Sequence, residues 1–128
     1  DSFNPHNRER VEFVSSLTEA KYKNSMKVLS KARVEMDRLF ENYDLFLSPA
    51  LSGEAPVGLK EVRTATFARL WTQMYTPSVC FPIFEGPNGL PVCFQMIGRR
   101  NSDEQTLVNA KRVDDQLKGV LGAGPFRL

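Results

Sequence analysis

Few residues in this chain have types and spacing that could do chemistry. The one histidine, His6, stands in a polar stretch without a second base or metal ligand nearby, so we expect no functional role for it. No Cys/His spacing suits zinc, no glycine-rich loop suits a phosphate, and no Gly-x-Ser-x-Gly elbow is present. Serine and lysine are plentiful but show no pairing of nucleophile and base. The sequence predicts no catalytic residue, no cofactor site and no metal site here.

Residues 48–58 are the best candidate for a binding element. They are rich in Gly and Pro, which favours a fixed backbone shape, and they follow a short apolar run. Open α/β sheets bind ligands where their strands end, so this loop could form the wall of a substrate pocket. An ordinary rigid connection is the equally weighted alternative. The candidate wall residues are Pro49, Ala50, Gly53, Glu54 and Ala55.

Glu54 is the most informative of these residues. If it is buried it needs a partner, and if it is exposed it could meet a polar leaving group. Trp71 is the sixth pocket candidate, but its spacing from Phe67, Leu70 and Met74 favours packing between a helix and a sheet. Gln95 is predicted to be structural, since a buried amide on a strand must be hydrogen-bonded.

Cys80 and Cys93 both lie in apolar, strand-like runs. Two buried free thiols are the favoured interpretation. A disulfide is the minor alternative, because it would require the two residues to pair directly opposite each other across neighbouring strands.

Sequence patterns predict an α/β fold. A helix over 16–40 begins at a capping box of Ser16 and Glu19, and a second box, Ser102 with Gln105, opens a helix that stops near Gly119. A shorter helix runs from Phe67 to Tyr75. The predicted strands are 45–47, 79–84 and 90–97, the last two forming a hairpin around 85–89, while 1–15 is predicted to be an irregular leader.

The strand at 45–47 is continuously apolar, which is typical of a strand buried on both faces rather than of a sheet edge. We therefore expect residues 1–128 to be one segment of a larger sheet, and the absence of an initiator Met agrees with a piece from inside a longer protein. No run approaches the ~18 to 20 apolar residues of a membrane helix. Free cysteines and no signal segment favour the cytoplasm.

The charge pattern argues against nucleic-acid binding. The 17 basic and 15 acidic residues are mixed along the 128-residue chain, giving a net charge of +2. A nucleic-acid footprint would instead gather Lys and Arg on one face with few interleaved acids.

Four separated segments, in order, resemble the closing portion of amidase-signature enzymes. They are SPALSGEAPVGL at 48–59, Phe67 through Trp71-Thr72, Pro77-Ser78-Val79 with Pro82, and GPNGLPVCFQMIG at 86–98. The family includes bacterial amidases, fatty-acid amide hydrolase and the amidase subunit of the tRNA-dependent amidotransferase. The match covers about half of the chain and looks closest to the general bacterial amidases. Cys93 stands where the family usually has Gly, so tighter packing is expected there.

The resemblance implies a C-terminal part of the amidase-signature fold, a mixed sheet covered by helices, with about three strands and three to four helices in this chain. It implies hydrolysis of carbon–nitrogen bonds by a Ser-Ser-Lys triad: a nucleophilic serine, a second serine that relays the proton, and a lysine. Those residues would lie upstream, and no residue here matches them. This chain alone is therefore expected to be catalytically silent.

The implied partners are the remainder of the amidase domain and a small-molecule amide substrate, and a homodimer of the parent is one state the resemblance allows. Two other functions stay open. One is a subunit of a glutamine-dependent tRNA amidotransferase, which delivers ammonia rather than releasing it. The other is a non-catalytic binding domain that reuses the scaffold.

Overall fold

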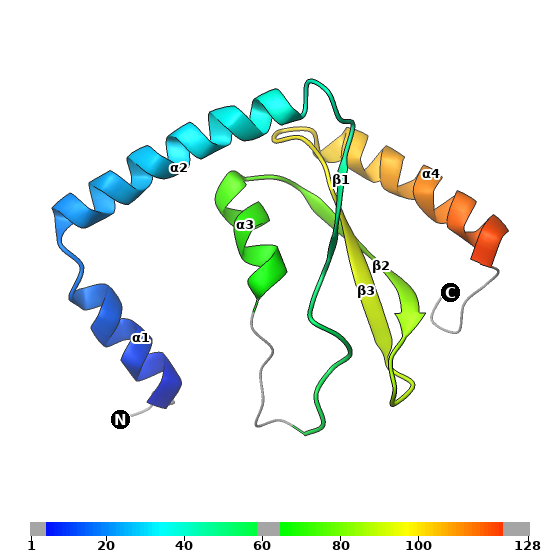
Figure 1. Cartoon of the computed structure of the whole chain (residues 1–128), viewed down its shortest axis with the longest axis horizontal. Coiled ribbons are helices and arrows are strands. Elements are labelled where there is room, and N and C mark those ends of the chain that lie inside the picture. Colours follow the sequence, from blue (N-terminus) through cyan, green and yellow to red (C-terminus); the bar gives the residue numbers. More distant parts are fainter. Residues whose placement is uncertain (1–4, 59–64, 122–128) are drawn as a thin grey trace. The chain divides into compact units, whose positions relative to one another are not determined.

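A computed structural model describes residues 5–58 and 65–121 (Figure 1). The chain divides into two compact units, Asp1–Val34 and Glu35–Leu128. In the described residues it is an α/β protein with four helices and three strands, which confirms the predicted fold class and the expected element numbers. No described helix has the length and apolar character needed to cross a membrane.

The first unit holds helix α1, Pro5–Ser15, and most of helix α2, Glu19–Leu39. The prediction of an irregular leader is therefore wrong for residues 5–15. Proline suits the first position of a helix, and the Arg and Glu side chains that follow are good helix formers. The segment has no apolar stripe, so hydrophobic periodicity could not reveal it. Residues 1–4 and the side chain of His6 lie outside the described part.

The predicted long helix is confirmed as α2, but its cap is not the predicted one. The Ser16 hydroxyl donates to the carbonyl of Phe13, 2.7 Å away, and so closes the end of α1. Thr18 Oγ1 accepts from the backbone N–H of Lys21 at 3.3 Å, which is the bond of an N-cap residue with the third residue of the helix. A capping box at Ser16 is therefore wrong, because α2 begins two residues later than a Ser16 cap requires.

The second unit is built on an antiparallel sheet of β1 (Phe46–Pro49), β2 (Ser78–Glu85) and β3 (Pro91–Ile97). The strand order is β1-β3-β2, so β3 is the central strand (Figure 1). Phe46 pairs with Ile97 and Pro49 with Phe94, while Ser78 of β2 also pairs with Ile97.

The predicted hairpin is confirmed, with its boundaries moved by one residue. Residues 86–90 join β2 to β3, the Gly86 N–H donates to the Leu90 carbonyl at 2.8 Å, and Gly89 adopts φ 76°. A β-bulge between Pro82 and Phe84 interrupts the register of β2. Pro82 is tolerated because β2 is an edge strand of the described sheet.

Strand β1 is the other edge of the described sheet, although its sequence predicted burial on both faces. Leu47 is 61% exposed. No strand pairs with the outer edge of β1 among the described residues, so burial of this strand within a larger sheet stays a prediction.

Helices α3 (Thr66–Met74) and α4 (Asp103–Leu121) pack on opposite faces of the sheet. Ala110 of α4 lies in the core with Phe81 and Met96. Trp71 of α3 stacks on Phe46, whose partner Ile97 points to the face opposite Met96. Each face of the sheet thus has its own helix.

The ends of these helices differ from the simplest sequence expectations. Helix α3 stops at Met74, and Tyr75 takes the left-handed conformation with φ 60°. The N–H groups of Tyr75 and Thr76 donate to the carbonyls of Thr72 and Trp71, which is a Schellman motif with a tyrosine in the position glycine usually takes.

The capping box predicted for α4 does not form. The Ser102 hydroxyl donates to the Arg99 carbonyl, and Gln105 donates to Asn109 at 3.0 Å. The helix starts next to this serine as expected, yet continues to Leu121, beyond the predicted stop at Gly119.

Candidate functional site

The carboxylate of Glu54 is buried, and its side chain ties the loop after β1 to the tip of the hairpin. Glu54 is 6% exposed. Its Oε1 accepts from the backbone N–H of Asn88 at 3.1 Å, its Oε2 accepts from the N–H of Leu90 at 3.2 Å, and the Asn88 side-chain amide donates to Oε1. Of the two alternatives for Glu54, the structure thus shows the buried residue with partners.

Two glycines allow this contact. Gly53, directly before Glu54, has φ 128°, a conformation that residues with a side chain rarely adopt. Gly86 stands so close to Glu54 that a Cβ there would lie 2.8 Å from the Glu54 Cβ and closer still to the carboxylate. The backbone of the hairpin therefore approaches the Glu54 side chain as only glycine permits.

The residues before Glu54 continue the sheet beyond β1. The Ala50 N–H donates to the Cys93 carbonyl at 2.9 Å, and the Gln95 side chain donates to the Pro49 carbonyl at 3.0 Å. Gln95 is 3% exposed, which confirms its predicted structural role. The loop is thus fixed at Pro49 and Ala50 by the sheet and at Glu54 by the hairpin. Ala55, which follows Glu54, is exposed.

Trp71 lies at the other end of the sheet. Its ring stacks on Phe46 with centroids 6.3 Å apart, and Phe46 also contacts Phe40 and Tyr43. Phe46 pairs with Ile97 at one end of β3, whereas Glu54 binds the hairpin that precedes Pro91 at the other end. Six strand steps separate these ends, about 20 Å at ~3.4 Å per residue. The structure thus brings together five of the six pocket candidates and leaves Trp71 apart.

The position of Trp71 agrees with the packing role favoured from its spacing. Its indole N–H is buried, and no acceptor for it is present among residues 5–58 and 65–121. An unpaired buried donor is uncommon in a complete fold.

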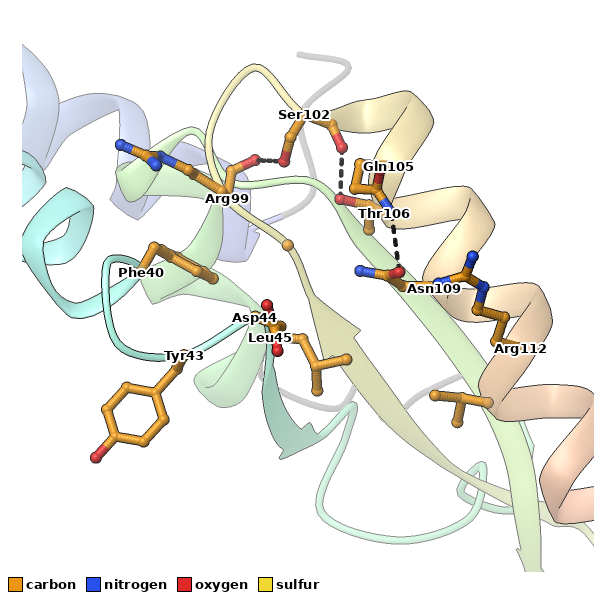
Figure 2. A pocket seen from close by; sticks show the side chains of 12 residues that line it. Phe40, Tyr43, Asp44, Leu45, Arg99, Ser102, Gln105, Thr106, Asn109 and Arg112 are labelled. Atoms are coloured by element: carbon orange, nitrogen blue, oxygen red, sulfur yellow. Dashed lines mark hydrogen bonds between the residues drawn. The ribbon is translucent and has the colours of Figure 1, made fainter.

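A cavity of about 570 Å³ lies where the α2–β1 and β3–α4 connections meet α4. Figure 2 shows Asp44 and Leu45 on one side of it and Asn109 and Arg112 on the other. None of the six predicted pocket residues lines it. Sequence reasoning missed it because its walls come from three separated segments: Phe40, Tyr43, Asp44 and Leu45; Gly98, Arg99 and Ser102; and Gln105, Thr106, Asn109, Arg112 and Val113.

The polar groups of this cavity include one carboxylate, Asp44, and the hydroxyls of Ser102 and Thr106. Its lining contains no His, Lys or Cys, and the hydroxyls of Ser102 and Thr106 donate to the carbonyls of Arg99 and Ser102. Serine needs an adjacent base to become a nucleophile. Across the described residues, no group of three His, Cys, Asp or Glu side chains is placed to hold a metal ion.

The two cysteines are free. Cys80 pairs with Gln95 and Cys93 with Pro82, so the thiols are not directly opposite, as a disulfide would require. The prediction of free thiols is confirmed, but burial of both is wrong, because Cys80 is exposed on edge strand β2. Partial burial of its thiol, with a smaller contribution from Cys93, raises the pKa of Cys80.

Comparison with known proteins adds two kinds of likeness. The chain is 26% identical over 110 residues to one component of the glutamyl-tRNA(Gln) amidotransferase of Clostridium acetobutylicum, covering 80% of this chain and 23% of that protein. It also superposes on the crystal structure of an amidase with a TM-score of 0.78 and 23% identity, over 89% of this chain and 29% of the other. The resemblance to the amidase-signature family is confirmed.

A second solved structure agrees with this fold. It belongs to a vestigial protein complex that bears on the evolutionary origins of an s-triazine catabolic enzyme, with a TM-score of 0.77 and 21% identity over 89% of this chain and 28% of that one. No protein-family model matches the chain. The chain spans between about a quarter and three tenths of the length of these three proteins.

Proposed function

We propose that this chain is the C-terminal portion of an amidase that hydrolyses amide carbon–nitrogen bonds with a Ser-Ser-Lys triad located upstream. The observation that carries the proposal is the combined likeness: most of the chain matches amidase-signature proteins in sequence and fold, yet it covers under a third of each. In the cavity, the Ser102 and Thr106 hydroxyls donate to backbone carbonyls.

In this proposal the chain supplies scaffold and one wall of the substrate pocket. The upstream serine attacks the amide carbonyl while the lysine accepts its proton through the second serine; the C–N bond then breaks and the ammonia or amine leaves with that proton, and water hydrolyses the acyl-enzyme to the acid and free serine. The one carboxylate of residues 48–58, Glu54, is occupied by Asn88 and Leu90, so in this proposal it acts by fixing the shape of the wall.

The remainder of the amidase domain is the first partner proposed for this chain. Leu47 is 61% exposed on an edge strand, and Trp71 has an unpaired indole donor within the described part of the chain. Leu47 and Trp71 lie on opposite faces of the sheet, and each fits a surface that a further strand or helix of the same protein covers. A cytoplasmic location and a homodimeric parent remain expectations of the same proposal.

An amidotransferase component is the second candidate, and the Clostridium acetobutylicum relative favours it. Such a protein would pass ammonia to an acceptor instead of releasing it. A non-catalytic binding domain is the third candidate, and it would need this chain to fold alone despite its exposed edge.

The test is ammonia release by the full-length protein from simple aliphatic and aromatic amides. Hydrolysis without glutamine, tRNA or a second protein supports the amidase. Activity that requires glutamine and a partner protein points to the amidotransferase. Absence of turnover under both conditions contradicts both enzymatic proposals.

A further inference from the structure

The Glu54 carboxylate joins two segments that are 34 to 36 residues apart in the sequence. The two backbone donors at the hairpin tip, Asn88 and Leu90, both point at this one side chain, and the Asn88 amide adds a third bond. A carboxylate can accept all of these bonds at once, because it is an acceptor only and offers two oxygens. The contact therefore depends on the position of both carboxylate oxygens of Glu54.

The same loop has a second anchor. Pro49 and Ala50 are bonded to Gln95 and Cys93 of the central strand. Residues 51–53 are thus held between the sheet on one side and the hairpin on the other. A wall fixed at two points keeps its shape without a ligand, which is the condition for a preformed pocket.

We propose that Glu54 is a positioning residue for substrate binding, which locks the wall at 48–58 to the hairpin tip at 86–90 so that the two move as one unit. This inference rests on the proposed amidase function. It adds that the hairpin tip, more than 30 residues away in sequence, shares in setting the pocket shape through Asn88 and Leu90. Glu54 acts through the backbone of the wall and does not itself touch the reacting atoms.

An exchange of donor and acceptor distinguishes the lock from mere loss of a side chain. Glu54→Gln replaces one carboxylate oxygen by an NH2 group. This group is a donor, so it cannot accept the hydrogen bonds that Asn88 donates. Adding Asn88→Asp restores the pairing with donor and acceptor reversed, since the new glutamine amide can donate to the aspartate. Glu85→Gln is the matched control, because Glu85 is an exposed carboxylate beside the same hairpin.

The experiment uses the full-length protein, with amide hydrolysis and hydrogen exchange measured on each variant. For Glu54→Gln we expect KM to rise roughly 5- to 30-fold, the equivalent of one or two kcal/mol, with a smaller change in kcat. Amide exchange should become faster in peptides covering 50–58 and 86–91. The double variant should recover most of both effects, and the control should match the wild type.

Unchanged KM and unchanged exchange in Glu54→Gln would overturn the inference. Faster exchange together with a lower kcat and an unchanged KM would also overturn it. A purely structural role lowers the amount of active enzyme and leaves substrate binding unchanged. If the wild-type protein hydrolyses no amide, the proposed function fails by itself, and exchange in 86–91 still decides whether the lock exists.

Discussion

The two ends of the three-stranded sheet are held by different kinds of contact. At the hairpin end, one buried carboxylate, Glu54, accepts hydrogen bonds from Asn88 and Leu90. At the opposite end, Phe46 lies among aromatic rings, including Phe40 at a centroid distance of 4.8 Å and Trp71 at 6.3 Å. The stability of the hairpin end depends on the direction of hydrogen bonds to a carboxylate. The stability of the aromatic end depends on the shape and the apolar area of the packed rings.

This difference indicates how each end responds to change. A polar lock fails when one partner is lost, because the buried donors then have no acceptor. An aromatic cluster loses stability in proportion to the contacts removed, since its energy is spread over several ring pairs. The hairpin end is suited to fixing one loop conformation, and the aromatic end is suited to holding α3 on the sheet.

The largest effect is expected from Glu54→Ala. This change leaves the N–H groups of Asn88 and Leu90 without their acceptor. We expect the free energy of unfolding to fall by about 2 to 4 kcal/mol, measured by urea titration. A loss below that of Phe46→Leu would contradict the contrast between the two ends.

Gly86→Ala tests the same end from the other side of the contact. The added methyl group would collide with the Glu54 side chain, so we expect a loss of about 1 to 3 kcal/mol. In the Glu54→Ala background the collision with the carboxylate is removed but the one with the Cβ of residue 54, at 2.8 Å, remains, so the cost of Gly86→Ala should fall only in part. Additive losses in this double-mutant cycle would show that the two positions are not coupled.

Phe46→Leu probes the aromatic end. It removes ring contacts with Phe40, Tyr43 and Trp71 but keeps an apolar side chain. The expected loss is about 1 to 2 kcal/mol in the free energy of unfolding. Hydrogen exchange in 86–91 should stay slow in this variant, and faster exchange there would mean that the two ends are not independent.

Tyr75→Gly is expected to stabilise the aromatic end. Tyr75 ends α3 in the left-handed conformation at φ 60°, where a side chain is strained and glycine is not. We expect a gain of about 0.5 to 1 kcal/mol in thermal or urea unfolding. A loss of stability would show that contacts of the tyrosine ring outweigh the backbone strain.

The smallest effect concerns Cys80, which lies on β2 between the two ends. Burial raises its pKa, and Cys93 adds to the shift. A raised pKa means that the Cys80 thiol stays protonated up to a higher pH, so the reactive thiolate forms only at that higher pH. The rate of alkylation by iodoacetamide should therefore reach its midpoint at higher pH than for an unstructured cysteine peptide. Cys93→Ser should lower that midpoint slightly, and a midpoint at or below that of the peptide would contradict the assignment.

The sequence predicts the local elements of this molecule well. Gly86-Pro87-Asn88-Gly89 indicates the hairpin, and apolar spacing indicates α2 and α4, because turn chemistry and periodicity are local properties. The cap of α2 is predicted less well. Ser16 and Thr18 are both suitable hydroxyl residues, and the end of α1 decides which one is available.

The site is predicted only in part, because its contacts are not local. Glu54 stands out in the sequence as a carboxylate in a Gly/Pro-rich loop, but its donors are 34 and 36 residues away, so neither its burial nor its role can be read from spacing. Trp71 is a pocket candidate by sequence together with that loop, yet the antiparallel register places it at the opposite end of β3. The edge position of β1 likewise depends on pairing that the apolar run at 45–47 does not reveal.

Under the proposed amidase function, the hairpin end shapes the substrate pocket and the aromatic end holds the scaffold. The most direct test compares KM and kcat for amide hydrolysis by the full-length protein carrying Glu54→Gln or Phe46→Leu, at a temperature where both variants remain folded. We expect a raised KM for Glu54→Gln and a KM close to wild type for Phe46→Leu. Equal changes of KM in the two variants would contradict the claim.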